Sequence, residues 1–133
     1  MTQAESAARR GLFVTIEGLE GAGKTTQARL LHERLRPSYD VLHTREPGGT
    51  AIGERIRGLV LDEQHREMSP HTEMLLFAAS RAQFVAEVVE PALERGRLVL
   101  SERYVDASLA YQGYARGLDI EVVRSVNAVA TRG

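Results

Sequence analysis

The sequence contains no cysteine and no tryptophan, and aromatic residues make up only 5% of its 133 residues. Without cysteine there is no disulfide framework, no thiol nucleophile and no cysteine-based zinc site. The formal net charge of −1 gives no general electrostatic case for binding nucleic acid or an anionic membrane. Residues 1–10 lack the apolar core of a signal peptide, and no apolar run approaches membrane-spanning length. Length and absences together predict one soluble, cytoplasmic domain.

Glycine, in contrast, is concentrated in one short segment that fits the pattern G-x-x-x-x-G-K-[ST] of a phosphate-binding P-loop. The segment consists of Gly18, Leu19, Glu20, Gly21, Ala22, Gly23, Lys24 and Thr25. Glycines let a backbone wrap closely around a polyphosphate, with its N–H groups pointing inward. The lysine adds a positive charge for the outer phosphates, and the threonine hydroxyl is suited to Mg²⁺. The segment therefore predicts an ATP phosphate site.

The surrounding sequence has the order of elements that this motif requires. An apolar, β-branched segment at 12–17 precedes the loop, and residues 26–35 carry apolar side chains at helical spacing until Pro37. Further strands are expected at 39–44 and 97–102. Further helices are expected from Thr50 to about Asp62, from Ser69 to about Arg95 with a break at Pro91 and an end at Gly96, at 105–114, and from Asp119. Strands that alternate with helices predict an α/β fold, a P-loop NTPase-type parallel sheet with helices on both faces.

Charged, polar and aromatic residues are expected at the edge where the predicted strands end, because open α/β sheets bind their ligands there. They are Arg45, Glu46 and Arg57 after the second strand, Phe77 and Arg81 one helical turn apart, and Glu102, Arg103, Ser108, Tyr111 and Gln112 at and after the third. An acidic residue that ends an apolar strand after a P-loop is the usual place for a Mg²⁺-linked carboxylate. On the residues alone, however, Arg57 and Arg81 could be solvated, Phe77 could belong to the core, and Glu102 could pair with Arg103.

The four histidines do not predict a further metal site. His32, His43, His65 and His71 are scattered without the spacing of metal ligands. We interpret them as structural or surface residues.

Four segments make the chain resemble bacterial thymidylate kinases. They lie at 16–26, 44–50, 76–81 and 102–117, and together they extend the resemblance over essentially residues 11–133. The first is common to many P-loop proteins, whereas the other three are specific in their order and spacing. The resemblance implies transfer of a phosphoryl group from ATP to dTMP, with Mg²⁺, to give ADP and dTDP.

The same resemblance implies roles for most of the candidate residues. Lys24 and Thr25 match residues on the ATP phosphates and the metal, with Glu102 as the second metal-linked group. Glu20 matches an acid that faces the dTMP sugar and phosphate. The remaining matches are Arg45, Arg57 and Arg103 around the dTMP phosphate, Phe77 stacked on thymine, Arg81 and Gln112 at the thymine edge, and Ser108 and Tyr111 nearby. Lys24, Glu20, Arg103 and Glu102 are the implied catalytic group.

The sequence departs from the family pattern at two positions, and the predicted domain has fewer strands than the family fold. Glu102 stands where the family often has aspartate, and Gly21 stands where one subclass carries a P-loop arginine. In the other subclass a mobile lid supplies that arginine from later in the chain. We expect residues 1–10 to be a polar tail, and residues 11–133 to be a kinase domain with about three of the usual five strands and no lid. A truncated domain of this kind is expected to be weakly active or inactive.

Two other functions remain open at this stage. The chain could act on another nucleoside monophosphate, or it could be a nucleotide-binding module without catalysis. The resemblance also implies a homodimer that uses the long third-helix region. The apolar stripe of Met74, Ala78, Val85 and Val89 is compatible with that interface and equally with packing on the sheet.

Overall fold

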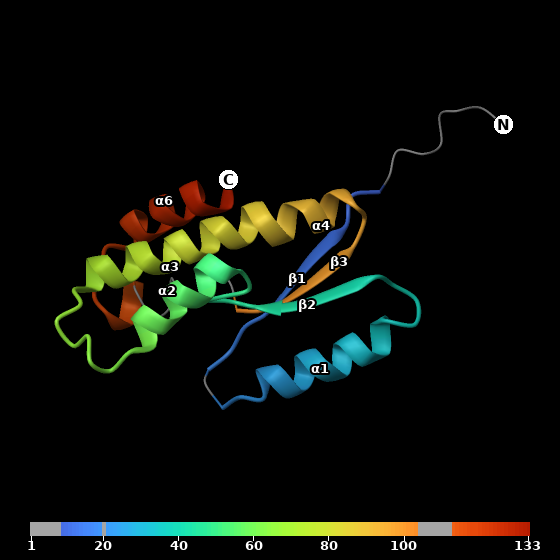
Figure 1. Ribbon diagram of the computed structural model, residues 1–133, viewed down its shortest axis with the longest axis horizontal. Coiled ribbons are helices and arrows are strands. Elements are labelled where there is room, and N and C mark those ends of the chain that lie inside the picture. The colour runs from blue at the N-terminus through green and yellow to red at the C-terminus, as the bar shows by residue number, and fades with distance from the viewer. Residues whose placement is uncertain (1–8, 20, 104–112) are drawn as a thin grey trace.

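A three-stranded parallel sheet lies at the centre of the computed structural model, which describes residues 9–19, 21–103 and 113–133. The strands are β1 (Leu12–Ile16), β2 (Val41–Arg45) and β3 (Leu98–Glu102), and β3 lies between the other two. Each strand begins and ends within two residues of its predicted position. The predicted parallel α/β arrangement is therefore confirmed for the described part of the chain (Figure 1).

The helices also begin where local sequence signals predict. The described helical segments are α1 (Lys24–Leu35), α2 (Ala51–Leu61), α3 (Pro70–Phe84), η1 (Val85–Val89), α4 (Glu90–Glu94) and α6 (Ile120–Thr131). Thr50, Ser69 and Asp119 accept backbone hydrogen bonds at the starts of α2, α3 and α6, which confirms the three predicted N-caps. The helix expected at 105–114 lies largely outside the described residues.

The long helical region changes form before Pro91. The sequence predicts one helix that is kinked or broken at Glu90, and the structure instead has a π-helical segment, η1, ahead of that point. Proline has no N–H to donate, and its ring clashes with the carbonyl one turn earlier in a regular α-helix. The wider π turn makes room for the ring, so that the helical path continues to Gly96, whose φ of 76° ends it as predicted.

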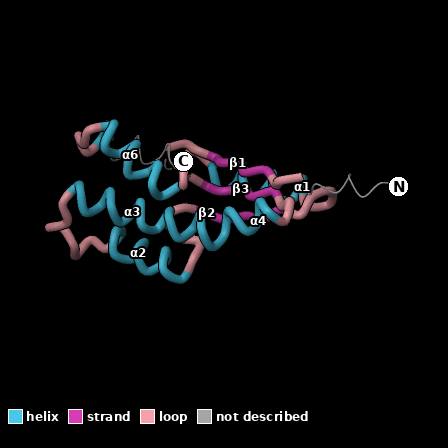
Figure 2. Tube along the Cα trace, turned by 90° about the horizontal axis from the view of Figure 1, so that it is seen from above, coloured by secondary structure: helices cyan, strands magenta, loops and turns pink. Residues whose placement is uncertain are grey.

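The main hydrophobic core lies between one face of the sheet and the α3–η1–α4 region. Val99 of β3 is fully buried, and Phe13 and Leu42 stand at the same register level on β1 and β2. Phe84 and Val89 pack against this row. In Figures 1 and 2, α2, α3, α4 and α6 lie on this side of the sheet.

Helix α1 covers the opposite face of the sheet (Figure 1). Side chains alternate between faces along a strand, so the next register level points toward α1. That level contains Val14, the fully buried Leu100, and His43. Helices therefore cover both faces, as predicted. No helix among the residues that the structure describes is long and apolar enough to cross a membrane.

Gly49 provides a test of how the loop between β2 and α2 packs on this core. Its φ is +80°, and a Cβ atom there would lie 2.9 Å from a ring carbon of the buried Phe84. We expect Gly49→Ala to lower the free energy of unfolding by roughly 1–3 kcal/mol, because both the backbone and the core would be strained. Urea unfolding monitored by circular dichroism measures the difference.

Gly58→Ala is the matched control. Gly58 lies within α2, and nothing is found within 4 Å of a Cβ atom built on it. Alanine should raise the free energy of unfolding here by roughly 0.5–1 kcal/mol, since it has the higher helix propensity. A Gly49→Ala chain as stable as the unsubstituted one would contradict the described packing of this loop on Phe84.

Candidate active site

The phosphate loop follows β1 and leads directly into α1. Gly21 and Gly23 have φ values of 77° and 91°, and a Cβ built on either residue would meet no atom within 4 Å apart from those of the glycine and its two chain neighbours. Both glycines face a cavity of about 470 Å³. Lys24 bends back over the loop and donates hydrogen bonds to the carbonyl oxygens of Gly18 and Leu19 at 2.9 and 2.6 Å. The loop thus presents an open backbone surface, the start of a helix and an ammonium group to one space, which suits an anion.

Thr25 and Glu102 meet across the gap between α1 and the end of β3. The Thr25 hydroxyl donates a 2.6 Å hydrogen bond to Glu102 Oε1. Adjacent oxygen ligands of an octahedral Mg²⁺ ion lie about 2.9 Å apart, because each Mg–O distance is about 2.0–2.1 Å. A hydroxyl and a carboxylate at this separation are a donor set that fits Mg²⁺. Among the residues described, no group of three or more His, Asp or Glu side chains forms a metal site of its own.

The second oxygen of Glu102 has a partner that the sequence did not reveal. Oε2 lies 2.9 Å from His43 Nε2. The sequence predicts that all four histidines are structural or surface residues, and His65 and His71 are exposed. For His43 that interpretation is incomplete, since its side chain is part of the site. Only the pairing of β2 with β3 brings the two residues together, and no local sequence signal encodes that pairing.

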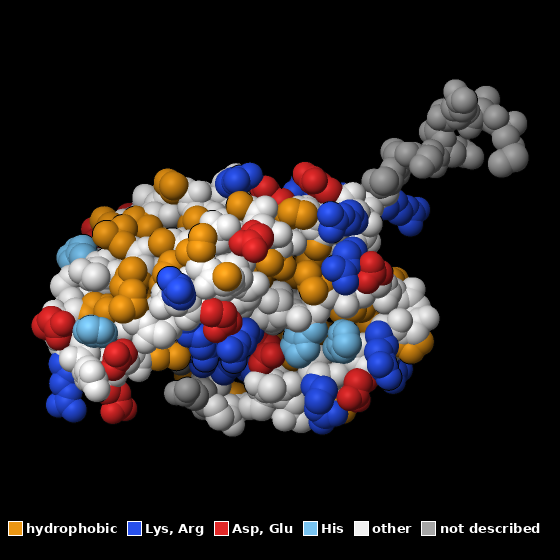
Figure 3. All heavy atoms as spheres, viewed as in Figure 1, with side chains coloured by type: hydrophobic (Ala, Val, Ile, Leu, Met, Phe, Trp, Pro, Cys, Tyr) orange, Lys and Arg blue, Asp and Glu red, His pale blue; other side chains and the backbone are white. Residues whose placement is uncertain are grey.

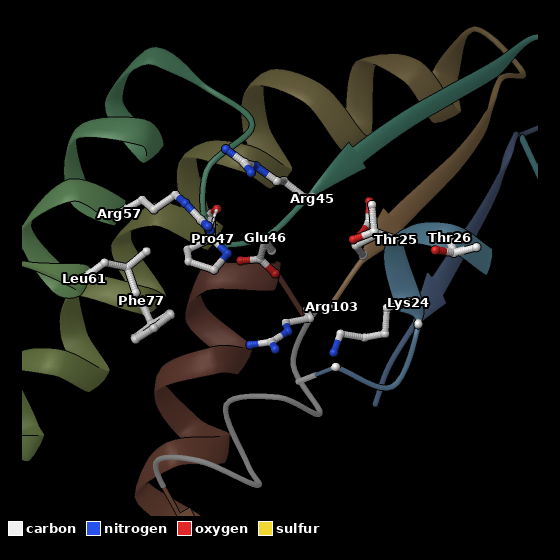
Figure 4. Close-up of a pocket in the computed structure, with 13 residues that line it drawn as sticks. Lys24, Thr25, Thr26, Arg45, Glu46, Pro47, Arg57, Leu61, Phe77 and Arg103 are labelled. Atoms are coloured by element: carbon white, nitrogen blue, oxygen red, sulfur yellow. Dashed lines mark hydrogen bonds between the residues drawn. The ribbon is translucent and has the colours of Figure 1, made fainter. Parts of the chain in front are cut away.

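The cavity extends from the phosphate loop to the ends of β2 and α2 (Figure 4). Ten of the candidate residues from the sequence line it: Gly21, Gly23, Lys24, Thr25, Arg45, Glu46, Arg57, Phe77, Glu102 and Arg103. Lys24 and the three arginines outnumber the two carboxylates that line the same space, Glu46 and Glu102, so the cavity is cationic. A single cavity therefore joins the predicted donor phosphate site to most of the predicted acceptor site.

The arginines at the acceptor end are held by neighbouring groups. Arg57 is half-buried and donates a 3.1 Å hydrogen bond to the Pro47 carbonyl, so it is not simply a solvated helix residue. Arg45 is more exposed and forms a 3.6 Å ion pair with Glu54. Arg103 has a φ of 68°, a left-handed conformation that is uncommon for a residue with a side chain. Backbone strain of this kind is often found at functional sites.

Phe77 and Arg81 lie one turn apart on α3, but their surroundings differ. Phe77 lines the cavity and is not among the fully buried core residues. Arg81 is only 2% exposed and is not among the residues that line the cavity, so it is not the solvated residue considered as an alternative. Its Nε lies 2.9 Å from both carboxylate oxygens of Glu46, and it also hydrogen-bonds Asn127 on α6. The Asn127 contact could not be predicted from sequence, because 46 residues separate the partners.

Glu46 is the acidic member of this buried group, and it also lines the cavity. Its Oε2 accepts the Arg81 hydrogen bond, whereas its Oε1 accepts none. Burial raises the pKa of Glu46 to about 7, the Arg81 charge and hydrogen bond oppose that rise, and the Glu17 carboxylate adds to it. Loss of solvation outweighs the single arginine partner.

Four predicted site residues lie outside the described residues, namely Glu20, Ser108, Tyr111 and Gln112. Their predicted roles stay predictions.

Strand, phosphate loop, helix and parallel sheet together define a P-loop nucleotide-binding fold. A family model described as thymidylate kinase matches residues 16–132. The chain is 53% identical over 124 residues to a thymidylate kinase of Exiguobacterium sp. strain AT1b and 58% identical over 123 residues to one of Roseiflexus castenholzii. Each match covers 92% of this chain, and 58% and 54% of the respective relative. The chain belongs to the thymidylate kinase family.

A solved structure agrees with this assignment. The crystal structure of thymidylate kinase from Ehrlichia chaffeensis superimposes with a TM-score of 0.85 at 35% identity. The match covers 91% of this chain and 68% of that one. The chain thus spans a little more than half the length of the curated relatives it matches, with the family's fold in the part present.

The raised pKa of Glu46 predicts how the free energy of unfolding depends on pH. Because its pKa rises from 4.5 to about 7 on folding, the folded chain holds more protons than the unfolded chain between these values. Its contribution to stability is therefore complete below about pH 4.5 and is lost as the pH rises through about 7. Relative to Glu46→Gln, the unsubstituted chain should lose unfolding free energy over this range, by no more than about 1.4 kcal/mol per pH unit.

Urea unfolding of both chains between about pH 5 and pH 8 tests this. Gln at position 46 does not titrate, so it reports the pH dependence of all other groups. Parallel profiles for the two chains would contradict the raised pKa.

Proposed function

We propose that this chain carries the phosphate loop and the acceptor site of an enzyme that transfers the γ-phosphoryl group of ATP to dTMP. The observation that carries the proposal is the shared cavity. Lys24 and Thr25 lie at one end of it, and Arg57 and Phe77 lie at the other. Phosphoryl transfer depends mostly on holding donor and acceptor in line and on neutralising charge, and a shared cationic cavity serves both needs.

On the donor side, the loop backbone and Lys24 bind the outer phosphates of ATP. Thr25 and Glu102 would hold Mg²⁺, which neutralises charge on the transferred group when bound. The oxygen donors of the pair and their 2.6 Å separation support this assignment. Thr25 lies in the first turn of α1, directly after the loop, and Glu102 is the last residue of β3.

On the acceptor side, Arg45, Arg57 and Arg103 bind the phosphate dianion of dTMP. Guanidinium groups donate paired hydrogen bonds to phosphate oxygens, so several around one dianion give strong, directional contacts. Phe77 offers a flat face to the base. Glu20, Ser108, Tyr111 and Gln112 complete the proposed dTMP site in the roles implied by the family, whereas Arg81 is buried and does not line the cavity. The cytoplasmic location expected from the sequence stays a prediction.

Acceptor binding is the first test, because it does not require turnover. We expect dTMP to raise the unfolding temperature of the chain more than AMP, GMP or CMP does. Arg57→Ala should weaken dTMP binding by about 10-fold to 100-fold, the value of a charge-assisted hydrogen bond of about 1.5–3 kcal/mol. Thymidine binding should barely change, since thymidine has no phosphate. Isothermal titration calorimetry measures both affinities.

Arg55→Ala is the matched control, because Arg55 is an exposed arginine on the same helix and does not line the cavity. Transfer itself is followed with ATP labelled on the γ-phosphate, over hours so that a slow reaction is detected. Label should appear in dTDP, require Mg²⁺ and disappear in Lys24→Ala. Equal stabilisation by all four nucleotides would indicate a different acceptor. A non-catalytic nucleotide-binding module and the truncated kinase domain expected from the sequence would both bind dTMP without transfer.

We also propose that the protein forms a homodimer through the outer surface of α2, α3 and α6. The stripe considered in the sequence, Met74, Ala78, Val85 and Val89, is buried within the chain and does not supply this surface. Other large apolar side chains on these helices are exposed: Ile52, Leu59, Leu75, Val122 and Val129. Figure 3 shows hydrophobic side chains gathered over the same three helices. An apolar surface of this kind is typical of a protein interface.

Sedimentation velocity over a range of concentrations tests the dimer. We expect a dimer for the unsubstituted chain and a shift to monomer for the double variant Leu75→Glu, Val129→Glu, since buried, unpaired carboxylates oppose association. Arg36→Glu, an exposed change beyond the end of α1, is the control and should leave the dimer intact. A monomer at all concentrations would refute the proposal.

A further inference from the structure

His43 lies outside the phosphate loop, yet it contacts Glu102, one of the two residues proposed to hold Mg²⁺. Its Nε2 atom lies 2.9 Å from Glu102 Oε2, while Glu102 Oε1 accepts the 2.6 Å hydrogen bond of Thr25. One carboxylate thus joins a strand residue on one side to the first turn of α1 on the other. Both side chains of the histidine–carboxylate pair are largely shielded from solvent, with 26% and 15% exposed.

The strand register explains why these three residues meet. His43 pairs with Leu100, so both side chains point to the α1 face, and Glu102 points to the same face two residues further along β3. Thr25 approaches from α1, which covers this face. The His32 ring of α1 lies 5.7 Å from the His43 ring and packs beside it at a tilt. His43 is thus held by a neighbour as well as by its hydrogen bond.

The chemistry of the two groups determines which one donates the hydrogen bond between His43 and Glu102. An ionised carboxylate only accepts hydrogen bonds, so the imidazole Nε2 carries the proton and donates it. A glutamate side chain has three rotatable bonds, and each must be fixed for its carboxylate to stay at one position. Thr25 restrains one oxygen, and His43 restrains the other. Together they leave the carboxylate little rotational freedom.

We propose that His43 is a positioning residue that holds the Glu102 carboxylate against Thr25, so that the two present a preformed pair of oxygen ligands to the metal of the nucleotide. This rests on the proposed function, because it assigns Thr25 and Glu102 to Mg²⁺. Partners that orient a metal-binding carboxylate typically contribute 10–100-fold to metal affinity. His43 acts through Glu102 and touches neither nucleotide nor metal.

The test compares ATP affinity with Mg²⁺ and with EDTA, by isothermal titration calorimetry on the whole chain without an acceptor. The quantity of interest is the gain in affinity that Mg²⁺ provides. We expect His43→Leu to reduce that gain about 10-fold and to leave the affinity in EDTA unchanged. His43→Gln should restore most of the gain, because its amide nitrogen reaches about as far as imidazole Nε2 and also donates. A purely structural role for His43 would lower both affinities together.

Glu102→Asp provides the second arm. Its carboxylate is one methylene shorter and should no longer reach both partners, so adding His43→Leu to Glu102→Asp should change the Mg²⁺ gain by less than about twofold. Thermal unfolding of each variant establishes that it is folded. An unchanged Mg²⁺ gain in His43→Leu, or an equal loss in both backgrounds, overturns the proposal.

A third measurement separates failure of this inference from failure of the proposed function. Imidazole ¹⁵N–¹H spectra without nucleotide should show His43 as the Nε2–H tautomer and a shift of that signal in Glu102→Gln. If the unsubstituted chain binds no ATP, the proposed function fails, and the inferred metal role fails with it, whatever the spectra show. If Mg²⁺ raises the affinity for ATP but the His43 signal does not shift in Glu102→Gln, only the positioning role is refuted.

Discussion

The parallel register of the three strands is the constraint on which the rest of the site depends. Ile16, Glu102 and Arg45 stand at one level, so all three strands end along a single line. The phosphate loop leaves from the first of these ends, a carboxylate stands at the second, and an arginine stands at the third. A shift of β3 by one residue would turn Glu102 to the opposite face, away from α1. The Thr25 contact and the His43 contact would be lost together.

The two faces of the sheet have different roles. The face toward α3 and α4 carries the apolar row around Val99 and supplies most of the burial that stabilises the sheet. The face toward α1 is apolar at Leu100 and becomes polar at Glu102, near the end of the strand. Stability and chemistry thus come from alternate residues of the same five-residue strand. This allows polar groups to approach the ligand edge without interrupting the core.

Local features of the fold could be predicted from the sequence, whereas features that join distant segments could not. Thr50, Ser69 and Asp119 are short-range signals, and each caps the helix that it was expected to cap. The P-loop residues likewise form a phosphate-binding motif that can be recognised within eight positions. His43 shows the limit, because its partner is 59 residues away and is reached only through strand pairing. Arg81 shows it again, since its buried partners lie on a loop and on α6.

The buried group of Glu46, Arg81 and Asn127 has a consequence for how this sequence can change. The three residues come from the loop after β2, from α3 and from α6, and Arg81 donates hydrogen bonds to both Glu46 and Asn127. Loss of one partner leaves a charge or amide buried without compensation, which typically costs 3–5 kcal/mol for an ion pair. A domain that is stable by only about 5–15 kcal/mol tolerates few such steps. Substitutions at these positions are therefore expected to be accepted in combination, so that segments remote along the chain evolve as one unit.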